Sequence, residues 1–226
     1  LLSVALLPLG IIALAQTQRS INSAQGAFEA SLRAQTARIA TPEREAIVSA
    51  FGLARGLADT LVILDPEEEA CTDLMVRARD GNAETSFVGF VGLGAISSCN
   101  SSRERFDFSD NPASARLFAD PRPEVTFNPA GEVSRQAVII VSQPVYDGAE
   151  FLGFVAISVP SRPISVQRPD LEAGDPGVFL TFNGRGEVLT TEGDPEDVTG
   201  KLPAGRSLED LARQGADTFR SRTVDG

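Results

Sequence analysis

The stretch VSRQAVIIVSQPVYDGAEFLGFVAISVP, residues 133–160, decides the fold class of this 226-residue chain. It contains two long segments rich in β-branched residues, 133–146 and 151–160, which we predict to be strands. Asp147-Gly148 lies between them, and this dipeptide is a strong signal for a tight hairpin turn. The stretch therefore predicts an antiparallel pair of long strands.

Shorter strands precede this pair. Residues 86–93 (SFVGFVGL) and 95–99 (AISSC) read as a hairpin that turns at Gly94. Residues 123–128 (PEVTFN) read as extended, and they are followed by a Pro-Ala-Gly turn. Together with the long pair, these segments predict a sheet of about five antiparallel strands.

Two helix-start signals interrupt the predicted strands. Asp65-Pro66-Glu67-Glu68 offers a capping Asp, a Pro at the first position and acids that suit the positive end of the helix dipole. This helix should end near Asp80-Gly81-Asn82. Ser109-Asp110-Asn111-Pro112 caps a second, short helix through Phe118. A sheet with helices inserted between its early strands predicts the α+β fold class.

An uncharged apolar run, Leu1–Ala15 (LLSVALLPLGIIALA), opens the sequence. It fits a truncated transmembrane helix over residues 1–17 or the core of a secretory signal peptide, and a buried soluble helix is a third reading. We favour the membrane helix because no cleavage motif stands out and the helical pattern continues into polar sequence. Either of the first two readings places the rest of the chain outside the cytoplasm.

Residues 18–62 continue as a predicted stalk helix. A thin apolar stripe recurs in it near helical spacing. The stripe consists of Ile21, Ala24, Phe28, Leu32 and Ile39. It predicts either a homodimer through the stalk or packing of the helix on its own domain. Thr41-Pro42-Glu43 predicts a helix start or a kink within this region.

The remaining sequence predicts two globular units. We assign residues 63–164 to the first unit, 165–176 to a connection and 177–226 to a second, smaller unit. In the second unit, 177–183 and 187–191 read as a hairpin, and Ser207 caps a short helix. The sequence stops within a further predicted strand, so we expect this unit to be incomplete.

Composition excludes several classes of function. The net charge of −11, with only scattered Arg, disfavours a nucleic-acid partner. The chain has no His, so it can build neither a Ser-His pair nor a phosphoacceptor His, and it has no glycine-rich nucleotide box. We expect no catalytic residue, metal or cofactor in this segment. Cys71 and Cys99 predict a disulfide in an exported domain, and two buried free thiols are the alternative.

The segment from Cys71 to Ile164 resembles the sensor regions of alphaproteobacterial histidine kinases, notably those of the HWE type. The resemblance is sharpest in SFVGFVGLGAISSC (86–99) and in FDFSDNPASARLFADPRPEVTFNPAGEVSRQAVIIVSQPVYDGAEFLGFVAISVPSRPI (106–164). The layout of the whole chain resembles double-Cache domains, which are PAS-like sensor domains found outside the cytoplasm. On this resemblance, 63–164 is a membrane-distal Cache domain with a PAS-like five-stranded sheet, and 177–226 begins a second Cache-like unit.

The resemblance implies a sensor of a small-molecule ligand, anchored in the lipid bilayer of the bacterial inner membrane. Residues from about Gln18 onward would lie in the periplasm. A cytoplasmic kinase region, absent from this sequence, would bind ATP and Mg²⁺. The same module also serves chemoreceptors and diguanylate cyclases, and an exported hydrolase or binding protein is a further alternative.

In Cache domains the ligand pocket lies on one face of the sheet, under loops and a short helix. Here the resemblance places it between residues 106–126 and the facing strand 134–142. The candidate ligand-binding residues are Ser109, Asp110, Arg116, Thr126, Asn128, Ser134, Arg135 and Ser142. Arg116 either holds a carboxylate with its guanidinium fork or is a solvated helix residue, and Asp110 is either a helix cap or a ligand contact.

Aromatic residues bear on the class of ligand. Tyr146 and Asp147 stand where amino-acid-binding Cache domains keep an aromatic and an acid, but Asp147-Gly148 also reads as a plain turn. The chain has no Trp, which disfavours amino-acid sensing. The strand residues Phe87, Phe90, Phe151 and Phe154 read as core and not as a ligand-binding set.

Overall fold

The computed structural model describes residues 2–161, 180–191 and 207–214, with side chains from Leu14 onward. Internal contacts divide the chain into two units, Leu1–Thr41 and Pro42–Gly226. The described residues of the first unit are entirely helical. The second unit contains every described strand, and it holds the candidate site.

Helix α1 runs from Leu2 to Leu64, which confirms the predicted long N-terminal helix. The helix start predicted at Thr41-Pro42-Glu43 is wrong, because α1 continues through these residues, while the alternative of a kink stays a prediction. Proline removes one backbone hydrogen bond from a helix, but Thr41 and Pro42 are exposed, so water can solvate the carbonyl group that loses its partner. The Thr41 hydroxyl donates to the carbonyl oxygen of Ala37 at 2.6 Å. Within the described residues, one helical segment, Leu14–Leu64, is long and apolar enough to cross a membrane.

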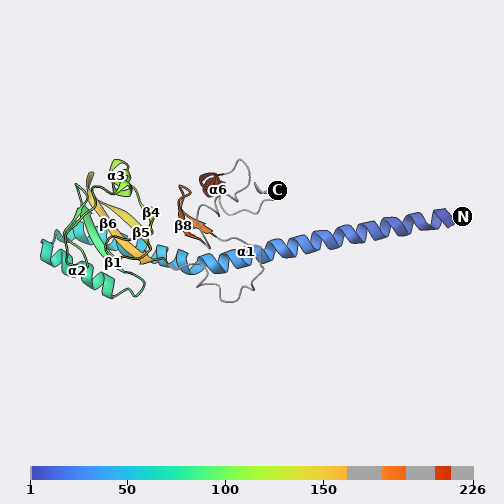
Figure 1. The fold of residues 1–226 in the computed structure, drawn as a ribbon, viewed down its shortest axis with the longest axis horizontal. Helices are drawn as coiled ribbons and strands as arrows, with labels where there is room; N and C mark the ends of the chain where they lie inside the picture. The colour runs from blue at the N-terminus through green and yellow to red at the C-terminus, as the bar shows by residue number, and fades with distance from the viewer. Residues whose placement is uncertain (1, 162–179, 192–206, 215–226) are drawn as a thin grey trace. The chain divides into compact units, whose positions relative to one another are not determined.

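Six antiparallel strands form one sheet in the order β3-β2-β1-β6-β5-β4 (Figure 1). Their bounds are β1 Phe87–Gly92, β2 Ile96–Ser97, β3 Phe106–Asp107, β4 Glu124–Asn128, β5 Val138–Asp147 and β6 Glu150–Pro160. The predicted α+β class is confirmed. The one strand beyond the five predicted is β3, whose two residues are too few to show a periodic pattern.

The β5–β6 hairpin confirms the turn predicted at Asp147-Gly148. Gly148 has a φ of +58°, in the left-handed region that glycine adopts at least cost. Gly153 in β6 has a φ of +145°, and a Cβ there would collide with the carbonyl oxygen of Val91 on β1. Strand β5 begins at Val138 and not near 133, because the preceding residues form a turn in which Arg135 has a φ of +54°.

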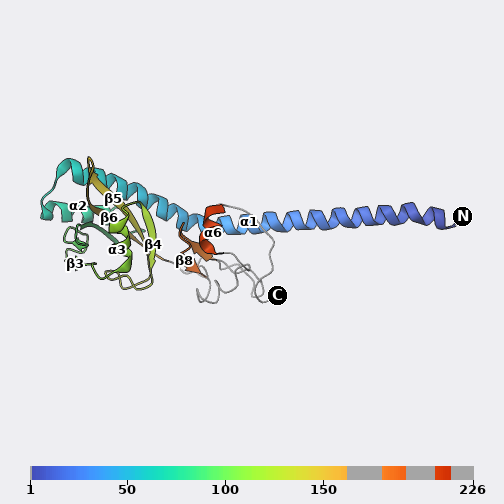
Figure 2. The same cartoon turned by 90° about the horizontal axis from the view of Figure 1, so that it is seen from above.

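The sheet separates two layers of helices (Figures 1 and 2). Helix α2 spans Glu68–Asp80, and helix α3 spans Pro112–Ala119. Helix α2 and the part of α1 after Pro42 pack on one face, where Val155, Ile157 and Val159 of β6 join the buried core. The alternate residues of β6 face the side covered by α3. Side chains alternate along a strand, so a single strand contributes to both layers.

The core between the sheet and α1 is close-packed. Ala50, Ala54 and Ala58 are buried on one side of α1, and their small side chains let the helix approach the sheet. On α2, Cys71 forms a disulfide with Cys99, with a Cα–Cα distance of 5.5 Å. The predicted disulfide is confirmed. Closing a loop of 28 residues stabilises the domain by about 3–4 kcal/mol on the chain-entropy model.

The predicted helix caps have different outcomes. Asp65 has a φ of +39° and does not cap α2, whose N-cap position is Glu67. Helix α3 is capped by Asn111 and not by Asp110, because the Asn111 side chain accepts the hydrogen bond of a first-turn N–H at 2.9 Å. The Ser207 hydroxyl accepts from the third residue beyond it, as predicted for the cap of α6.

The described part of the second predicted unit consists of a hairpin and a helix. Strand β7 spans Leu180–Phe182, strand β8 spans Val188–Thr191, and helix α6 spans Leu208–Gln214. This confirms a hairpin and a short helix at the predicted places. The predicted connection, 165–176, and the final predicted strand lie outside the described residues.

Polar side chains hold this hairpin against α1 and β4. The Glu43 carboxylate of α1 accepts hydrogen bonds from Thr181 at 2.7 Å and from Thr190 at 2.8 Å. In the turn between the strands, Arg185 pairs with the buried carboxylate of Glu124 on β4.

The same turn also covers the outer edge of β4. The Asn183 side chain donates to the carbonyl oxygen of Val125 at 2.7 Å, and the Phe127 N–H donates to Glu187 at 3.5 Å. Strand β4 is the last strand of the sheet. These side chains therefore satisfy backbone groups that an unprotected edge strand would leave open.

Candidate ligand-binding site

A cavity lies between α3 and the face of the sheet opposite α1. It has a free volume of about 90 Å³. The sheet side is formed by alternate residues of four strands, and the other side by α3, Phe108 and the turn at 131–134. The lining residues are Phe87 and Val91 of β1, Asn128 of β4, Val138, Ile140 and Ser142 of β5, Phe154, Ala156 and Ser158 of β6, Asn111, Ala113, Ser114, Leu117 and Phe118 at α3, and Phe108, Gly131, Glu132, Val133 and Ser134.

Strand register brings the polar residues of the sheet side together. Ser142 of β5 is paired with Ala156 of β6, and Ile140 is paired with Ser158. The two serines are therefore diagonal neighbours on one face, with their Cβ atoms roughly 7 Å apart in a standard antiparallel pair. A single small molecule can reach both hydroxyl groups.

Helix α3 is fixed over the cavity at both ends. At its N-terminus, Asn111 caps the helix and also donates from Nδ2 to Glu132 at 3.3 Å, which ties the helix to the 131–134 turn. Near its C-terminus, the Phe118 ring packs edge-on against Phe154, with ring centroids 5.4 Å apart, and against Phe151 at 5.9 Å. The helix thus closes the cavity without a covalent link to the sheet.

The structure brings together only part of the predicted ligand-binding set. Asn128, Ser134 and Ser142 line the cavity. Asp110 lines a neighbouring hollow that shares Asn111 and Asn128 with it. Four other predicted residues line neither space: Ser109, Arg116, Thr126 and Arg135.

Three of these four residues have a local reason for lying outside the cavity. Arg116 is on the exposed side of α3. Thr126 is buried in β4 and is paired with the lining residue Ile140, so it shares that face of the sheet but does not reach the cavity. Arg135 occupies an exposed turn position with positive φ. Ser109 supports the adjacent loop, where its backbone N–H donates to Asp107 at 2.9 Å.

The sequence prediction missed several lining residues. Asn111 and Ser114 lie on α3, and Glu132 lies in the turn next to a predicted residue. Ser158 could have been predicted from the sequence, because it is a polar residue between apolar residues in a strand that was predicted correctly. Phe87 and Phe154 are buried, as predicted, and both also line the cavity.

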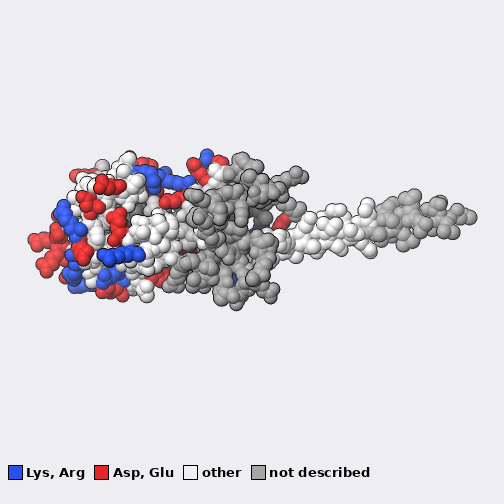
Figure 3. Space-filling view, in the orientation of Figure 1, with Lys and Arg blue, Asp and Glu red and all other residues white. Residues whose placement is uncertain are grey.

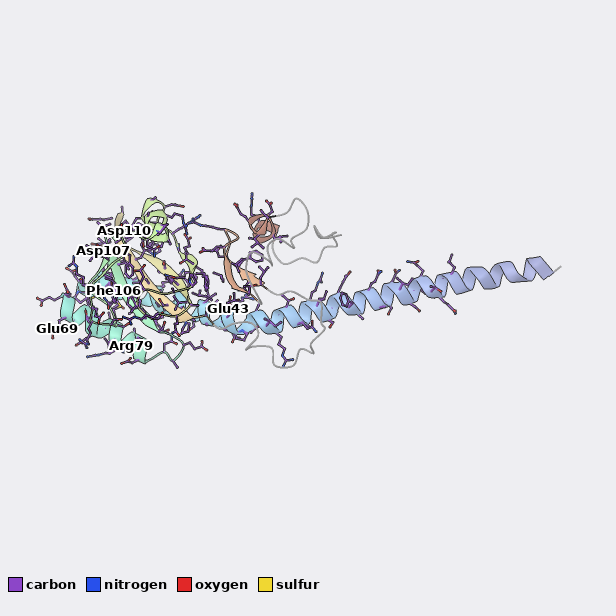
Figure 4. The ribbon with its side chains drawn as sticks, viewed as in Figure 1. Glu43, Glu69, Arg79, Phe106, Asp107 and Asp110 are labelled. Atoms are coloured by element: carbon purple, nitrogen blue, oxygen red, sulfur yellow. A yellow bond between two sulfur atoms is a disulfide. The ribbon has the colours of Figure 1, made fainter. Side chains whose placement is uncertain are left out.

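Among the described residues, the lining of this cavity contains no Lys or Arg, and Glu132 at its edge is the one charged lining residue. Elsewhere on this unit, acidic and basic side chains are interspersed (Figure 3). Asp107 and Asp110 lie beside α3 (Figure 4). Hydrogen bonds from the Ser109 side chain and backbone hold the pKa of the Asp107 carboxyl below its ordinary value. Negative charge therefore gathers near the edge of the cavity.

Comparisons with known proteins show which proteins share the fold that contains this cavity. No protein-family model matches the chain, and no curated protein matches it. Among solved structures, the extracellular domain of a candidate histidine kinase, rpHK1S-Z16, is similar at 16% identity and a TM-score of 0.59, over 81% of this chain and 76% of that one. The chain has the fold of extracellular sensor domains.

Two further sensor domains share this fold. An extracellular ligand binding receptor from Desulfohalobium retbaense is 15% identical, with a TM-score of 0.56 over 82% of this chain and 35% of that one. The ligand-binding domain of the amino-acid chemoreceptor PctC of Pseudomonas aeruginosa, in complex with GABA, is 17% identical, with a TM-score of 0.53 over 72% and 74%. This sensor-domain fold occurs in both kinase and chemoreceptor proteins.

Proposed function

We propose that the chain is the periplasmic ligand-sensing region of a membrane-bound bacterial histidine kinase, of the HWE type that its sequence resembles. The observation that carries this proposal is the cavity between α3 and the sheet, in a fold shared with extracellular sensor domains. Enclosed, mostly apolar cavities with a few convergent polar groups are the usual sites for small molecules. ATP and Mg²⁺ would bind to the kinase region and not to this segment.

We propose that the sheet couples ligand binding to α1, because one of its faces lines the cavity and the other packs against the helix. A ligand would contact Ala156 and Ser158 on one face of β6, while Ile157 between them packs in the core under α1. A molecule that binds one packing of the sheet against α1 more tightly than another shifts the population toward that packing. Helix α1 would carry the change to the lipid bilayer, because it begins in the uncharged apolar run Leu1–Ala15, which fits a truncated transmembrane helix.

We propose further that two copies pair through the first unit of α1. Leu14, Ile21 and Phe28 are exposed apolar residues of this helix. They recur every seven residues, the spacing of a coiled-coil seam. Cysteines placed singly along residues 14–28 should crosslink in membranes with this helical period, and crosslinks of equal yield at every position would argue against pairing.

A chemoreceptor is the second candidate, and the fold of the PctC ligand-binding domain supports it equally. The residues that follow Gly226 in the gene decide between the outputs. A phosphoacceptor histidine and a nucleotide-binding domain would support the kinase. A long methylated coiled coil would indicate a chemoreceptor, and a GGDEF-type domain would indicate a diguanylate cyclase.

Ligand sensing is tested by thermal denaturation of the intact chain in detergent against a broad panel of small molecules. A ligand at 100 times its Kd should stabilise the folded state by about 2.7 kcal/mol. Ala156→Leu fills the cavity and should abolish this stabilisation. Ala115→Leu is the matched control, because Ala115 is exposed on α3 and does not line the cavity. If no compound raises the Tm, or if Ala156→Leu keeps the response, the cavity is not a sensing site.

A further inference from the structure

We infer that the cavity accepts uncharged, largely apolar molecules that carry a hydrogen-bonding group, and that it rejects carboxylates. This inference rests on the proposed sensor function and adds the chemical class of the ligand. Three observations on the described residues carry it: the size of the cavity, a lining without Lys or Arg, and two serine hydroxyl groups that line it without a partner.

The volume sets the size of the ligand. A water molecule needs roughly 10–15 Å³ of this kind of space, so about 90 Å³ corresponds to roughly six to nine water-sized positions. The space therefore suits a molecule with about that number of non-hydrogen atoms. Phe87, Leu117 and Phe154 present apolar surface to most of such a molecule.

The lining sets the charge of the ligand. A carboxylate buried in the cavity would lose its water and gain no cation from the described lining residues, which include neither Lys nor Arg. Arg116, which could otherwise pair with it, is exposed on the far side of α3. A buried ion without a partner is strongly unfavourable. Glu132, at the edge, adds repulsion for an anion.

The two serines set the hydrogen-bonding group. Ser142 and Ser158 line the cavity, and neither hydroxyl has a hydrogen-bond partner within the part of the chain that the structure describes. Their oxygens are not among the fully buried side-chain atoms that lack a partner, so both remain accessible from the cavity. A ligand carbonyl, amide or hydroxyl group placed between these diagonal neighbours would satisfy both of them.

Matched probes test the charge preference. Isovaleramide, isovalerate and isopentylamine have nearly the same shape and are neutral, negative and positive at pH 7. We expect isovaleramide to raise the Tm of the intact chain and to bind at least about tenfold more tightly than isovalerate, which reflects the cost of burying an unpaired anion. Ser142→Ala and Ser158→Ala should each weaken isovaleramide binding by about three- to tenfold through a lost hydrogen bond.

A pair of arginine variants tests the charge preference in the opposite direction. Ser114→Arg places a cation in the cavity lining and should shift the preference from isovaleramide toward isovalerate. Ala115→Arg adds the same charge to the exposed side of α3 and should leave the preference unchanged.

The possible outcomes distinguish a failure of the inferred ligand class from a failure of the proposed sensor function. If isovalerate binds as tightly as isovaleramide and Ala156→Leu abolishes its binding, the charge preference is overturned while the sensor function stands. If isopentylamine binds most tightly, Glu132 selects a cation and the inference of an uncharged ligand is wrong. If isovaleramide gives no stabilisation, the inference also fails. The sensor function is then tested separately by thermal denaturation against the broad panel of small molecules.

Discussion

The pairing of Arg185 with Glu124 should couple the β7–β8 hairpin energetically to the six-stranded sheet. The Glu124 side chain is 6% exposed and that of Arg185 is 34% exposed. One Glu124 oxygen meets Arg185, and the other, Oε1, is buried without a partner. Replacing Arg185 by Met would therefore leave an uncompensated carboxylate inside the protein.

We expect Arg185→Met to lower the free energy of unfolding by about 2 kcal/mol. This value lies between the roughly 3–5 kcal/mol for breaking a fully buried pair and the about 1 kcal/mol or less for an exposed pair, because Arg185 is partly solvated. The double variant Glu124→Met with Arg185→Met buries no charge, so it should recover most of the loss.

Urea denaturation of the intact chain, followed by circular dichroism, measures this cycle. Arg213→Met is the control, since this residue pairs only with exposed acids on α6 and should change stability by less than about 0.5 kcal/mol. In hydrogen exchange, the Phe127 N–H should lose protection in Arg185→Met, because it bonds to the same turn. A double variant as unstable as Arg185→Met, or a single variant as stable as the parent, would refute the reasoning.

Three further predictions concern the core, the disulfide and the loop before α3. Ile157→Ala empties a fully buried position and should cost about 2–5 kcal/mol, whereas Ile63→Ala, at a position 79% exposed, should cost less than about 0.5 kcal/mol by urea denaturation. Reduction of the disulfide should remove about 3–4 kcal/mol and lower the Tm measured by calorimetry. In an NMR titration, Asp107 should have a midpoint below 3.8, and Ser109→Ala should raise it toward that value. Because its folded-state pKa is lowered, Asp107 stabilises the fold above its unfolded-state pKa, and that contribution disappears as the pH falls through the folded-state value.

Strand periodicity and turn chemistry predicted most of the fold from the sequence. The β5–β6 hairpin was predictable because Asp147-Gly148 signals a tight turn and the flanking segments are rich in β-branched residues. Strand β3 was not, because two residues have no period. The helix start predicted at Pro42 was wrong, because the local signal could not show that this position lies inside a longer helix with its proline exposed to water.

The candidate site was harder to predict, because a cavity depends on which side of an element each residue faces. Ser142 was found because a strand has only two faces. Arg116 could not be placed, since a helix of eight residues offers several faces and its sequence does not show which one meets the sheet. Arg135 was assigned to a strand, but its positive φ belongs to a turn that the sequence pattern did not show.

The alternation along β6 has a consequence for how such a protein can diversify. Phe154, Ala156 and Ser158 meet the cavity, while Val155 and Ile157 meet the helices. If the cavity binds a ligand as proposed, variation confined to the even-numbered positions would change the ligand preference and leave the contacts with the helices intact. Related sequences could then differ in the ligand that they bind while they keep the same packing of the sheet on α1.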